Sequence, residues 1–247
     1  MSAPVAVVTG GAQGIGASAG RHLAARGYRI HCIDRRASDE PGVTSHIGDV
    51  TDDSALADLA TRIGPIDALV PAAGINLRPD DNAAERLTLE AWSRTLDVNL
   101  TGVMLTVRHF RPRMRADGAI VCVSSIAALR AMPLADAYTA SKGAIVALTR
   151  SWAVDYSRFG IRVNCVCPGP TETAMMSGMI EQFGDKQQMQ LPQQRMATAD
   201  EVGAVIAFLA SRDASYVSGA IVPVDGGAAA ASAGMPFPRR RPVEGSP

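Results

Sequence analysis

Thr9-Gly10-Gly11-Ala12-Gln13-Gly14-Ile15-Gly16 is the stretch that decides the fold of this 247-residue chain. It follows the apolar run Val5–Thr9 and leads into a helical pattern over Ile15–Arg26. Glycine lets the backbone turn sharply and approach a pyrophosphate closely, and the start of a helix supplies free N–H groups and a positive dipole end. Strand, glycine loop and helix in this order predict a dinucleotide-binding unit. The candidate contacts in the loop are Gly10, Gln13, Gly14, Ile15 and Gly16.

An acidic residue stands where such a loop needs one. Asp34 ends the second apolar run, Arg29–Asp34. A carboxylate at this place can accept hydrogen bonds from the adenosine ribose and repels a 2′-phosphate, which favours NAD over NADP. Arg35 and Arg36 follow directly, and a guanidinium there could instead hold a 2′-phosphate. We therefore expect NAD, with Asp34 and Arg35 as contacts, and keep NADP as the alternative.

Apolar runs alternate with helical patterns along most of the chain. Several runs, such as Ala119–Ser124, are continuously apolar, as expected of strands that are covered on both faces. With right-handed crossovers, this alternation predicts a single-domain, Rossmann-like doubly wound α/β fold, with a seven-stranded parallel sheet and helices on both faces. The predicted strands are Val5–Thr9, Arg29–Asp34, Thr44–Gly48, Asp67–Ala72, Ala119–Ser124, Ile161–Val166 and Ala220–Val224, and the predicted helices are Ile15–Arg26, Asp52–Ile63, Thr88–Arg115, Tyr138–Phe159 and Ala199–Ser211.

Three residues refine this fold. Asp52 and Thr198 precede helical patterns and are expected to cap them. Pro223 removes a hydrogen-bond donor from the last strand, which is tolerated only at an edge of the sheet.

The charge balance directs the search for function to a small-molecule site. Lys and Arg number 24, Asp and Glu also number 24, and the formal net charge is zero. Such a chain has no long-range field that attracts nucleic acid or an anionic membrane. Hydrophobic residues make up 47% of the sequence, enough for a large core. No apolar run reaches the ~18 residues of a membrane span.

The cysteines are expected to be reduced core residues. Cys32, Cys122, Cys165 and Cys167 lie in apolar runs, and neither they nor the four histidines show the spacing of a metal site. The N-terminal residues lead into the first strand without the charged segment of a signal peptide. These features predict a cytoplasmic protein with no bound metal.

Tyr138 and Lys142 are four residues apart in a predicted helix and therefore project from one face. Free tyrosine has a pKa near ~10, too high for an efficient base at neutral pH, but a nearby ammonium lowers that pKa. The pair can then act as a general acid and base on an alcohol or carbonyl oxygen. Pairs with this spacing are also common on protein surfaces.

The glycine loop and the Tyr138-x-x-x-Lys142 motif together resemble the classical short-chain dehydrogenase/reductase family, over roughly residues 4–227. Ser125 resembles the substrate-orienting serine of the family, and Asn99 resembles the asparagine of its catalytic tetrad. Pro168–Thr173 is similar to the segment that meets the nicotinamide in the family, and Val224–Gly227 to the closing signature.

The resemblance implies an oxidoreductase that transfers a hydride between NAD(H) and a secondary alcohol or ketone. It implies that Tyr138 is the general acid/base and that Lys142 lowers its pKa and binds the nicotinamide ribose. Ser125 would hydrogen-bond the substrate oxygen, and Asn99 would hold a water in a proton relay. The other expected cofactor contacts are Asp49, Val50, Ala72, Ala73, Gly74, Val98, Pro168, Gly169, Thr171 and Thr173. For Asp49, a plain role in a strand–helix turn is nearly as good an interpretation.

One segment departs from the family pattern. Pro71-Ala72-Ala73-Gly74 stands where the family usually has Asn-Asn-Ala-Gly. Proline and alanine have no side-chain hydrogen-bonding group, so the contribution of those asparagines must be absent or replaced. We interpret the change as a tolerated variation.

The family also implies a boundary and an assembly. We expect a catalytic domain over residues 1–227, a substrate lid at about 174–198 with Met175 and Met176, and an Ala/Pro/Arg-rich tail over 228–247. A homotetramer or homodimer is implied, with Thr88–Arg115 and Tyr138–Phe159 as candidate interface helices. Two other functions remain open: an NADPH-dependent carbonyl reductase of the 3-oxoacyl or polyketide type, and a non-catalytic nucleotide-sensing protein.

Overall fold

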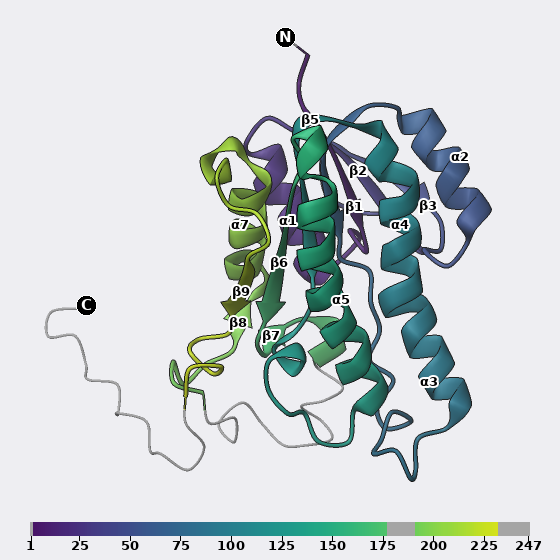
Figure 1. Ribbon diagram of the computed structural model, residues 1–247, viewed down its shortest axis with the longest axis vertical. Helices are drawn as coiled ribbons and strands as arrows, with labels where there is room; N and C mark the ends of the chain where they lie inside the picture. The colour runs from purple at the N-terminus through teal and green to yellow at the C-terminus, as the bar shows by residue number, and fades with distance from the viewer. Residues whose placement is uncertain (1, 177–190, 232–247) are drawn as a thin grey trace, which may run out of the picture.

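The structure, a computed structural model, describes residues 2–176 and 191–231 (Figure 1). Its main sheet has seven parallel strands in the order β3-β2-β1-β4-β5-β6-β9. The strands are β1 (Val5–Thr9), β2 (Arg29–Asp34), β3 (Val43–Ile47), β4 (Ile66–Pro71), β5 (Met114–Val123), β6 (Arg162–Pro168) and β9 (Ile221–Val224). The helices that cover the sheet are α1 (Gly14–Ala24), α2 (Asp53–Ile63), α3 (Leu89–Leu96), α4 (Gly102–Phe110), α5 (Asp136–Asp155) and α7 (Ala199–Ala210). The predicted doubly wound architecture is confirmed.

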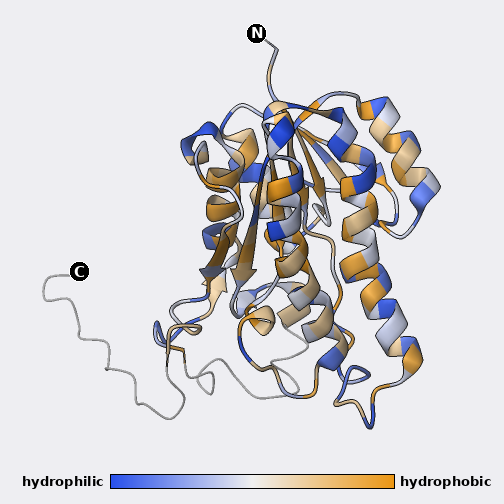
Figure 2. Cartoon of the chain, in the orientation of Figure 1, coloured by the Kyte–Doolittle hydropathy of each residue, from blue (hydrophilic) through white to orange (hydrophobic). Residues whose placement is uncertain are grey.

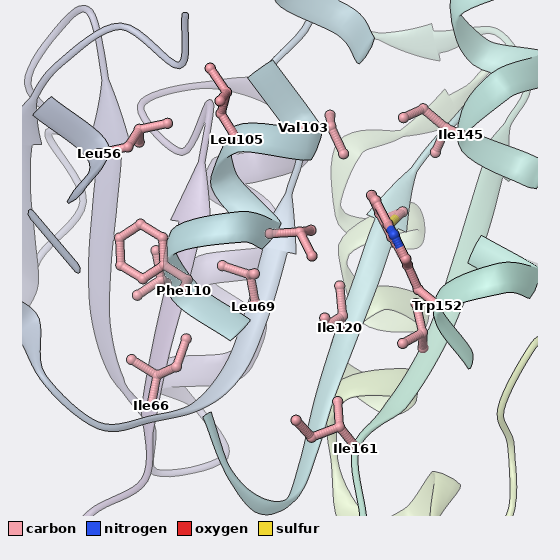
Figure 3. Packing of buried hydrophobic residues seen from close by; sticks show 14 of the residues in the cluster. Leu56, Ile66, Leu69, Val103, Leu105, Phe110, Ile120, Ile145, Trp152 and Ile161 are labelled. Atoms are coloured by element: carbon pink, nitrogen blue, oxygen red, sulfur yellow. The ribbon is translucent and has the colours of Figure 1, made fainter. Parts of the chain in front are cut away.

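The helices form a layer on each face of the sheet, and each layer has its own core. On one face, α2, α4 and α5 bury residues such as Leu56, Phe110 and Trp152 against the strands (Figure 3). On the other face, α1 and α7 bury Leu23 and Ile206. The central strands β1 and β4 and the second half of β5 are mostly apolar (Figure 2), because both of their faces are covered.

One predicted helix was wrong as a single element. Thr88–Arg115 consists of α3, a π-helical turn over Asp97–Thr101, and α4. The helical path then ends in a 3-10 turn, Arg111–Arg113. Pro112 in this turn has no N–H with which to continue the α-helix, and β5 begins at Met114, earlier than predicted. A second, two-stranded sheet of β7 (Thr171–Glu172) and β8 (Ala197–Thr198) had not been predicted.

The expected caps and the expected edge are confirmed. Asp52 accepts the N–H of Ala55, and Thr198 forms a reciprocal capping box with Glu201. Pro223 lies in β9, which among the described residues pairs with β6 alone and forms an edge of the sheet. In the part of the chain that the structure describes, no helix combines the length and the apolar character that crossing a membrane requires.

The close contact between α1 and α7 generates a stability prediction. A Cβ added at Gly203 would lie 2.2 Å from Ser18 Oγ and 2.8 Å from the Ser18 carbonyl carbon, so the two helices would have to separate. We expect Gly203→Ala to lower the free energy of unfolding by about 1 to 3 kcal/mol, measured by urea denaturation. Gly20→Ala is the matched control in α1, because its Cβ would meet only Ile30 at 3.5 Å. If both substitutions lower the free energy of unfolding equally, the explanation by steric contact between α1 and α7 is contradicted.

Candidate active site

A cavity of about 350 Å³ lies at the carboxyl ends of the parallel strands, where doubly wound sheets bind their ligands. In Figure 1 this is the lower edge of the sheet, toward which the arrowheads of β6 and β9 point. The cavity is lined by all predicted cofactor contacts: Gly10, Gln13, Gly14, Ile15, Gly16, Asp34, Arg35, Asp49, Val50, Ala72, Ala73, Gly74, Val98, Tyr138, Lys142, Pro168, Gly169, Thr171 and Thr173. Of the four predicted catalytic residues, Ser125, Tyr138 and Lys142 line it as well, whereas Asn99 lies behind its wall.

The glycine loop packs so closely against the start of α1 that it leaves no room for a side chain at Gly16. A Cβ added at Gly16 would lie only 2.2 Å from the carbonyl oxygen of Gly10, so α1 begins in direct contact with the loop that precedes it. Gln13, at the N-cap of α1, makes no capping bond with its side chain, so the first N–H groups of the helix are not taken by the cap. A helix start of this kind suits a phosphate group.

Asp34 lies half-buried at the end of β2, beside the glycine loop. Its Oδ2 accepts the N–H of Ala12 (3.1 Å) and its Oδ1 accepts the N–H of Arg36 (3.1 Å). Each carboxylate oxygen can accept two hydrogen bonds, so both keep the capacity to accept a ribose hydroxyl. The neighbouring Arg35 points its Nε at Asp49, 3.9 Å from Oδ2.

Asp49 lies in the turn between β3 and α2 and lines the cavity. Its Oδ1 accepts both the N–H (3.0 Å) and the hydroxyl (2.8 Å) of Thr51, which stabilises the turn between β3 and α2. The same residue and Val50 line the cavity beside Asp34. The turn therefore shapes the wall at the end of the cavity that lies farthest from Tyr138 along the sheet.

Thr9 binds the backbone that follows Pro71. The Thr9 carbonyl accepts the N–H of Ala72 (3.2 Å), and its Oγ1 accepts the N–H of Ala73 (3.3 Å). Pro71 is the last residue of β4 in register with β1, so its missing N–H falls where pairing ends. The backbone of β1 and β4 is thus held together without asparagine at these positions.

Asn99 uses its side chain to fix the chain beyond Gly74. Its Oδ1 accepts the N–H of Ile75 (2.7 Å), and its Nδ2 donates to the Ile75 carbonyl (2.9 Å) and to Ser141 Oγ (3.2 Å). The π-helical turn of α3–α4 places this fully buried amide between β4 and α5. A Cβ at Gly74 would lie 3.2 Å from Asn99 Oδ1 and 3.3 Å from Lys142 Nζ, so a glycine here lets both groups approach the backbone.

Tyr138 and Lys142 lie on the first two turns of α5, and both are buried. The Lys142 Nζ is 5.7 Å from the centroid of the Tyr138 ring and donates to the Val123 carbonyl (3.1 Å) at the end of β5. Ser124 Oγ donates to the Lys142 carbonyl (2.7 Å), which ties the same strand end to the helix. Ser125 Oγ accepts the N–H of Ala127 (3.1 Å) and also hydrogen-bonds with Tyr138.

The electrostatics differ from the sequence-based expectation. Burial raises the pKa of Tyr138 above its ordinary value, and the hydrogen bond with Ser125 acts in the opposite direction. Burial also lowers the pKa of Lys142 to about 8. The expected lowering of the Tyr138 pKa by Lys142 is not found, because loss of water outweighs the other effects on this phenol.

Part of the cavity wall is apolar. Met132, Met175 and Met176 line it, together with Ile75. The remaining residues of the expected lid include 177–190, which lie outside the described residues, as does most of the expected tail. Among the residues that are described, no group of three or more His, Cys, Asp or Glu side chains could hold a metal ion. All four cysteines are buried and free.

Sequence reasoning missed several members of the site. Ile75, Asn76 and Ser124 line the cavity and directly follow or precede predicted residues, so adjacency was the available signal. Asp81 was also missed. It is a buried acid that accepts hydrogen bonds from the first turn of α5, and nothing in its polar surroundings in the sequence distinguishes it from a surface residue.

Comparisons with known proteins agree with this geometry. A family profile described as Enoyl-(Acyl carrier protein) reductase matches residues 10–229. The chain is 41% identical to cis-4-hydroxycyclohexanecarboxylate dehydrogenase from Sinomonas cyclohexanicum, over 90% of this chain and 95% of that protein. Levodione reductase superposes with a TM-score of 0.85 at 31% identity, over 93% of this chain and 98% of the other. A crystallised short chain dehydrogenase/reductase family protein superposes with a TM-score of 0.82 at 33% identity, over 94% and 100%.

Proposed function

Since the chain belongs to the short-chain dehydrogenase/reductase family, whose members are oxidoreductases with a nicotinamide dinucleotide cofactor, we propose that it transfers a hydride between NAD(H) and a secondary alcohol or ketone. One observation carries this proposal. A single cavity connects the glycine loop and Asp34 at one end with Ser125, Tyr138 and Lys142 at the other. A dinucleotide bound along it would bring its reactive ring to the buried phenol.

The protein residues would supply the proton chemistry. A bound nicotinamide ring supplies or accepts the hydride. Tyr138 gives its proton to the ketone oxygen, and its raised pKa keeps the phenol protonated for this step at neutral pH. In the oxidation direction, the hydrogen bond with Ser125 stabilises the phenolate.

Lys142 and Asn99 would complete the catalytic group. With a pKa of about 8, Lys142 is charged at neutral pH and loses its charge as the pH rises through that value. The Val123 carbonyl holds its amine toward the cavity, where it could also bind the nicotinamide ribose. Asn99 would act through the loop that it fixes at Ile75, and by holding a water for the proton relay.

The apolar wall supports a substrate of modest size with some apolar character. Methionine side chains adapt to irregular apolar ligands, and three of them line the cavity. A suitable panel is cyclohexanol, 2-butanol, cis-4-hydroxycyclohexanecarboxylate and the corresponding ketones. The third compound is included because it is named in the relative that is 41% identical to this chain.

Replacing the phenol tests this function directly. We expect Tyr138→Phe to lower kcat by about 10²- to 10⁴-fold, because the proton donor is removed while the ring still packs in the same place. The measurement is absorbance at ~340 nm, where reduced nicotinamide absorbs, with the panel above. Calorimetric titration with NAD should show unchanged binding. Wild-type activity on the panel that survives in Tyr138→Phe would refute the assignment.

The choice of NAD rests on the adenosine end of the cavity. Asp34 presents a carboxylate beside the glycine loop, and a 2′-phosphate placed there would be repelled. Arg35, which could have attracted that phosphate, faces Asp49 instead. NADP-dependent reduction is the alternative that Arg36 keeps open, because its side chain stands exposed next to Asp34.

Asp34→Ala separates the two cofactors. We expect the substitution to raise the KM for NAD by about tenfold or more, since hydrogen bonds to a charged group are lost. The KM for NADP should fall or stay constant, because the repulsion is removed. Asp39→Ala, in the exposed loop after β2, is the control for the change in net charge. A wild-type enzyme that prefers NADP would overturn the assignment of NAD.

A non-catalytic, nucleotide-sensing protein on the same scaffold is the remaining alternative. The presence of Asn99, Ser125, Tyr138 and Lys142 around one cavity argues against it. That function would require ligand-dependent partner binding that survives Tyr138→Phe, without turnover on any carbonyl compound.

The exposed face of α5 supports a homodimer or homotetramer. Ala140, Ala147 and Val154 follow one another at seven-residue intervals, so they lie on one face of α5, and all three are exposed. In the same layer, Met104 of α4 is also exposed. Buried, free cysteines and the lack of long apolar helices among the described residues support the expected cytoplasmic location.

Sedimentation velocity tests the assembly. We expect the wild-type chain to sediment as a dimer or tetramer, and Ala147→Arg to dissociate it, because an arginine would place a charge in the small-residue face. Ala24→Arg, at the exposed end of α1, should leave the assembly intact. A monomeric wild-type protein, or equal behaviour of both variants, would contradict the proposed interface.

A further inference from the structure

Asp81 is a carboxylate that the proposed chemistry does not use, although it touches the residue at its centre. It lies in the loop after β4 and is only 1% exposed. Its Oδ1 accepts the N–H of Ala137 (3.0 Å), and its Oδ2 accepts the N–H of Tyr138 (2.8 Å). More than fifty residues of sequence separate the donors from the acceptor.

These two hydrogen bonds replace a cap that α5 lacks. The first N–H groups of any helix have no partner within the helix. Ala135, at the N-cap of α5, has no side-chain oxygen to accept them. Asp81 takes the two N–H groups that a serine or aspartate at the N-cap would normally take. Its negative charge also lies at the positive end of the helix dipole.

A cap within the helix and a cap from another loop differ in one respect. The side chain of an N-cap residue moves with its helix, whereas Asp81 is attached to the chain that leaves β4. The bonds of Asp81 therefore set where the first turn of α5, including Tyr138, lies relative to the sheet. Two further contacts act in the same direction: the Asn82 carbonyl accepts the N–H of Asp136 (3.3 Å), and Arg78 donates to the Pro133 carbonyl.

The same loop is also fixed at its other end. Ile75 is bound on both its N–H and its carbonyl by Asn99, which in turn bonds Ser141 of α5. The segment 75–82 thus runs along the start of α5 from the neighbourhood of Lys142 to the backbone of Tyr138. Ile75 and Asn76 line the cavity, as Tyr138 does, so this segment forms part of the cavity wall.

We propose that Asp81 is a positioning residue, whose carboxylate fixes the backbone of Tyr138 against the cavity wall formed by segment 75–82. The inference rests on the proposed function, because it matters for catalysis only if Tyr138 transfers the proton. Asp81 itself touches neither substrate nor cofactor. Its effect is the placement of the phenol, and small displacements of a reacting group are costly to the rate.

Asp81→Asn is the decisive substitution. The amide keeps one accepting oxygen but turns an NH₂ group toward the second N–H, so one of the two bonds is lost and the shape is kept. We expect kcat to fall about tenfold to hundredfold at saturating NAD, with the panel alcohol that the wild type oxidises fastest. The affinity for NAD should remain at the wild-type value, because the glycine loop and Asp34 lie at the other end of the cavity.

Asp80→Asn is the matched control, since it changes the same charge in the same loop at an exposed position. It should keep the wild-type kcat. Rates are compared per folded molecule, with the folded fraction taken from tryptophan fluorescence, to which the buried Trp152 contributes. If Asp81→Asn lowers only the melting temperature and keeps the wild-type kcat, Asp81 is merely a helix cap and the proposal is overturned.

A second variant covers the case in which Asp81→Asn does not fold. In Asp81→Asn/Ala135→Ser, a serine at the N-cap can bond the first-turn N–H groups from within the helix. If the double variant folds but keeps a low kcat, the positioning role of Asp81 is supported. If it regains both the fold and the wild-type kcat, the proposal is overturned.

Hydrogen exchange separates this inference from the proposed function. The amides of Ala137 and Tyr138 should be protected in the wild type and in Asp80→Asn, and exchange faster in Asp81→Asn. Fast exchange of these amides in the wild type would show that Asp81 does not fix the start of α5, and would overturn the proposal whatever the activity. If these amides are protected in the wild type but the enzyme turns over no compound of the panel, the proposed function is refuted. The positioning role of Asp81 in catalysis is then refuted with it.

Discussion

The buried amine of Lys142 is the constraint on which the rest of the site depends. An ammonium taken out of water is unstable unless polar groups surround it, and its lowered pKa reflects this. The structure meets the requirement with the Val123 carbonyl at the end of β5 and with the open backbone at Gly74. The amine can reach this position only because α5 lies directly over the strand ends, held there by Ser124 and by the amide of Asn99. Sheet, helix and loop are therefore fixed around one charge.

Much of the fold could be predicted because its signals are local. Continuous apolar runs identify buried strands, and the glycine loop, the two capping residues and Pro223 each carry a physical meaning within a few positions of sequence. All seven strands of the main sheet were found in this way. The π-helical turn at Asp97–Thr101 could not be found, since it depends on Asn99 bonding to Ile75 and Ser141, both distant in sequence.

In the candidate site, too, some residues could be predicted from local sequence signals and others could not. Residues in recognisable motifs, such as Tyr138, Lys142 and Asp34, were predicted from spacing and from the resemblance to a family. Asp81 was not, because its partners are two backbone N–H groups, which leave no trace in a sequence. The direction in which the pKa of Tyr138 shifts was also not predicted, because the burial of a phenol depends on the whole fold and not on the Tyr-x-x-x-Lys spacing. The hydrogen bond from the Ala73 N–H to the Thr9 side chain, which holds the chain just beyond Pro71 and Ala72, could not be predicted either, because the two residues are far apart in the sequence.

The contact between α1 and α7 has a consequence for biosynthesis. The apolar side of α1, with Ala19 and Leu23, is covered by α7, which begins at Ala199. During translation the nucleotide loop and α1 leave the ribosome long before their covering helix exists. The first half of the protein must therefore wait with an apolar surface open to water, a state in which chains associate wrongly or are captured by chaperones. The strand and glycine loop that identify this fold first in the sequence are thus among the last parts to be fully packed.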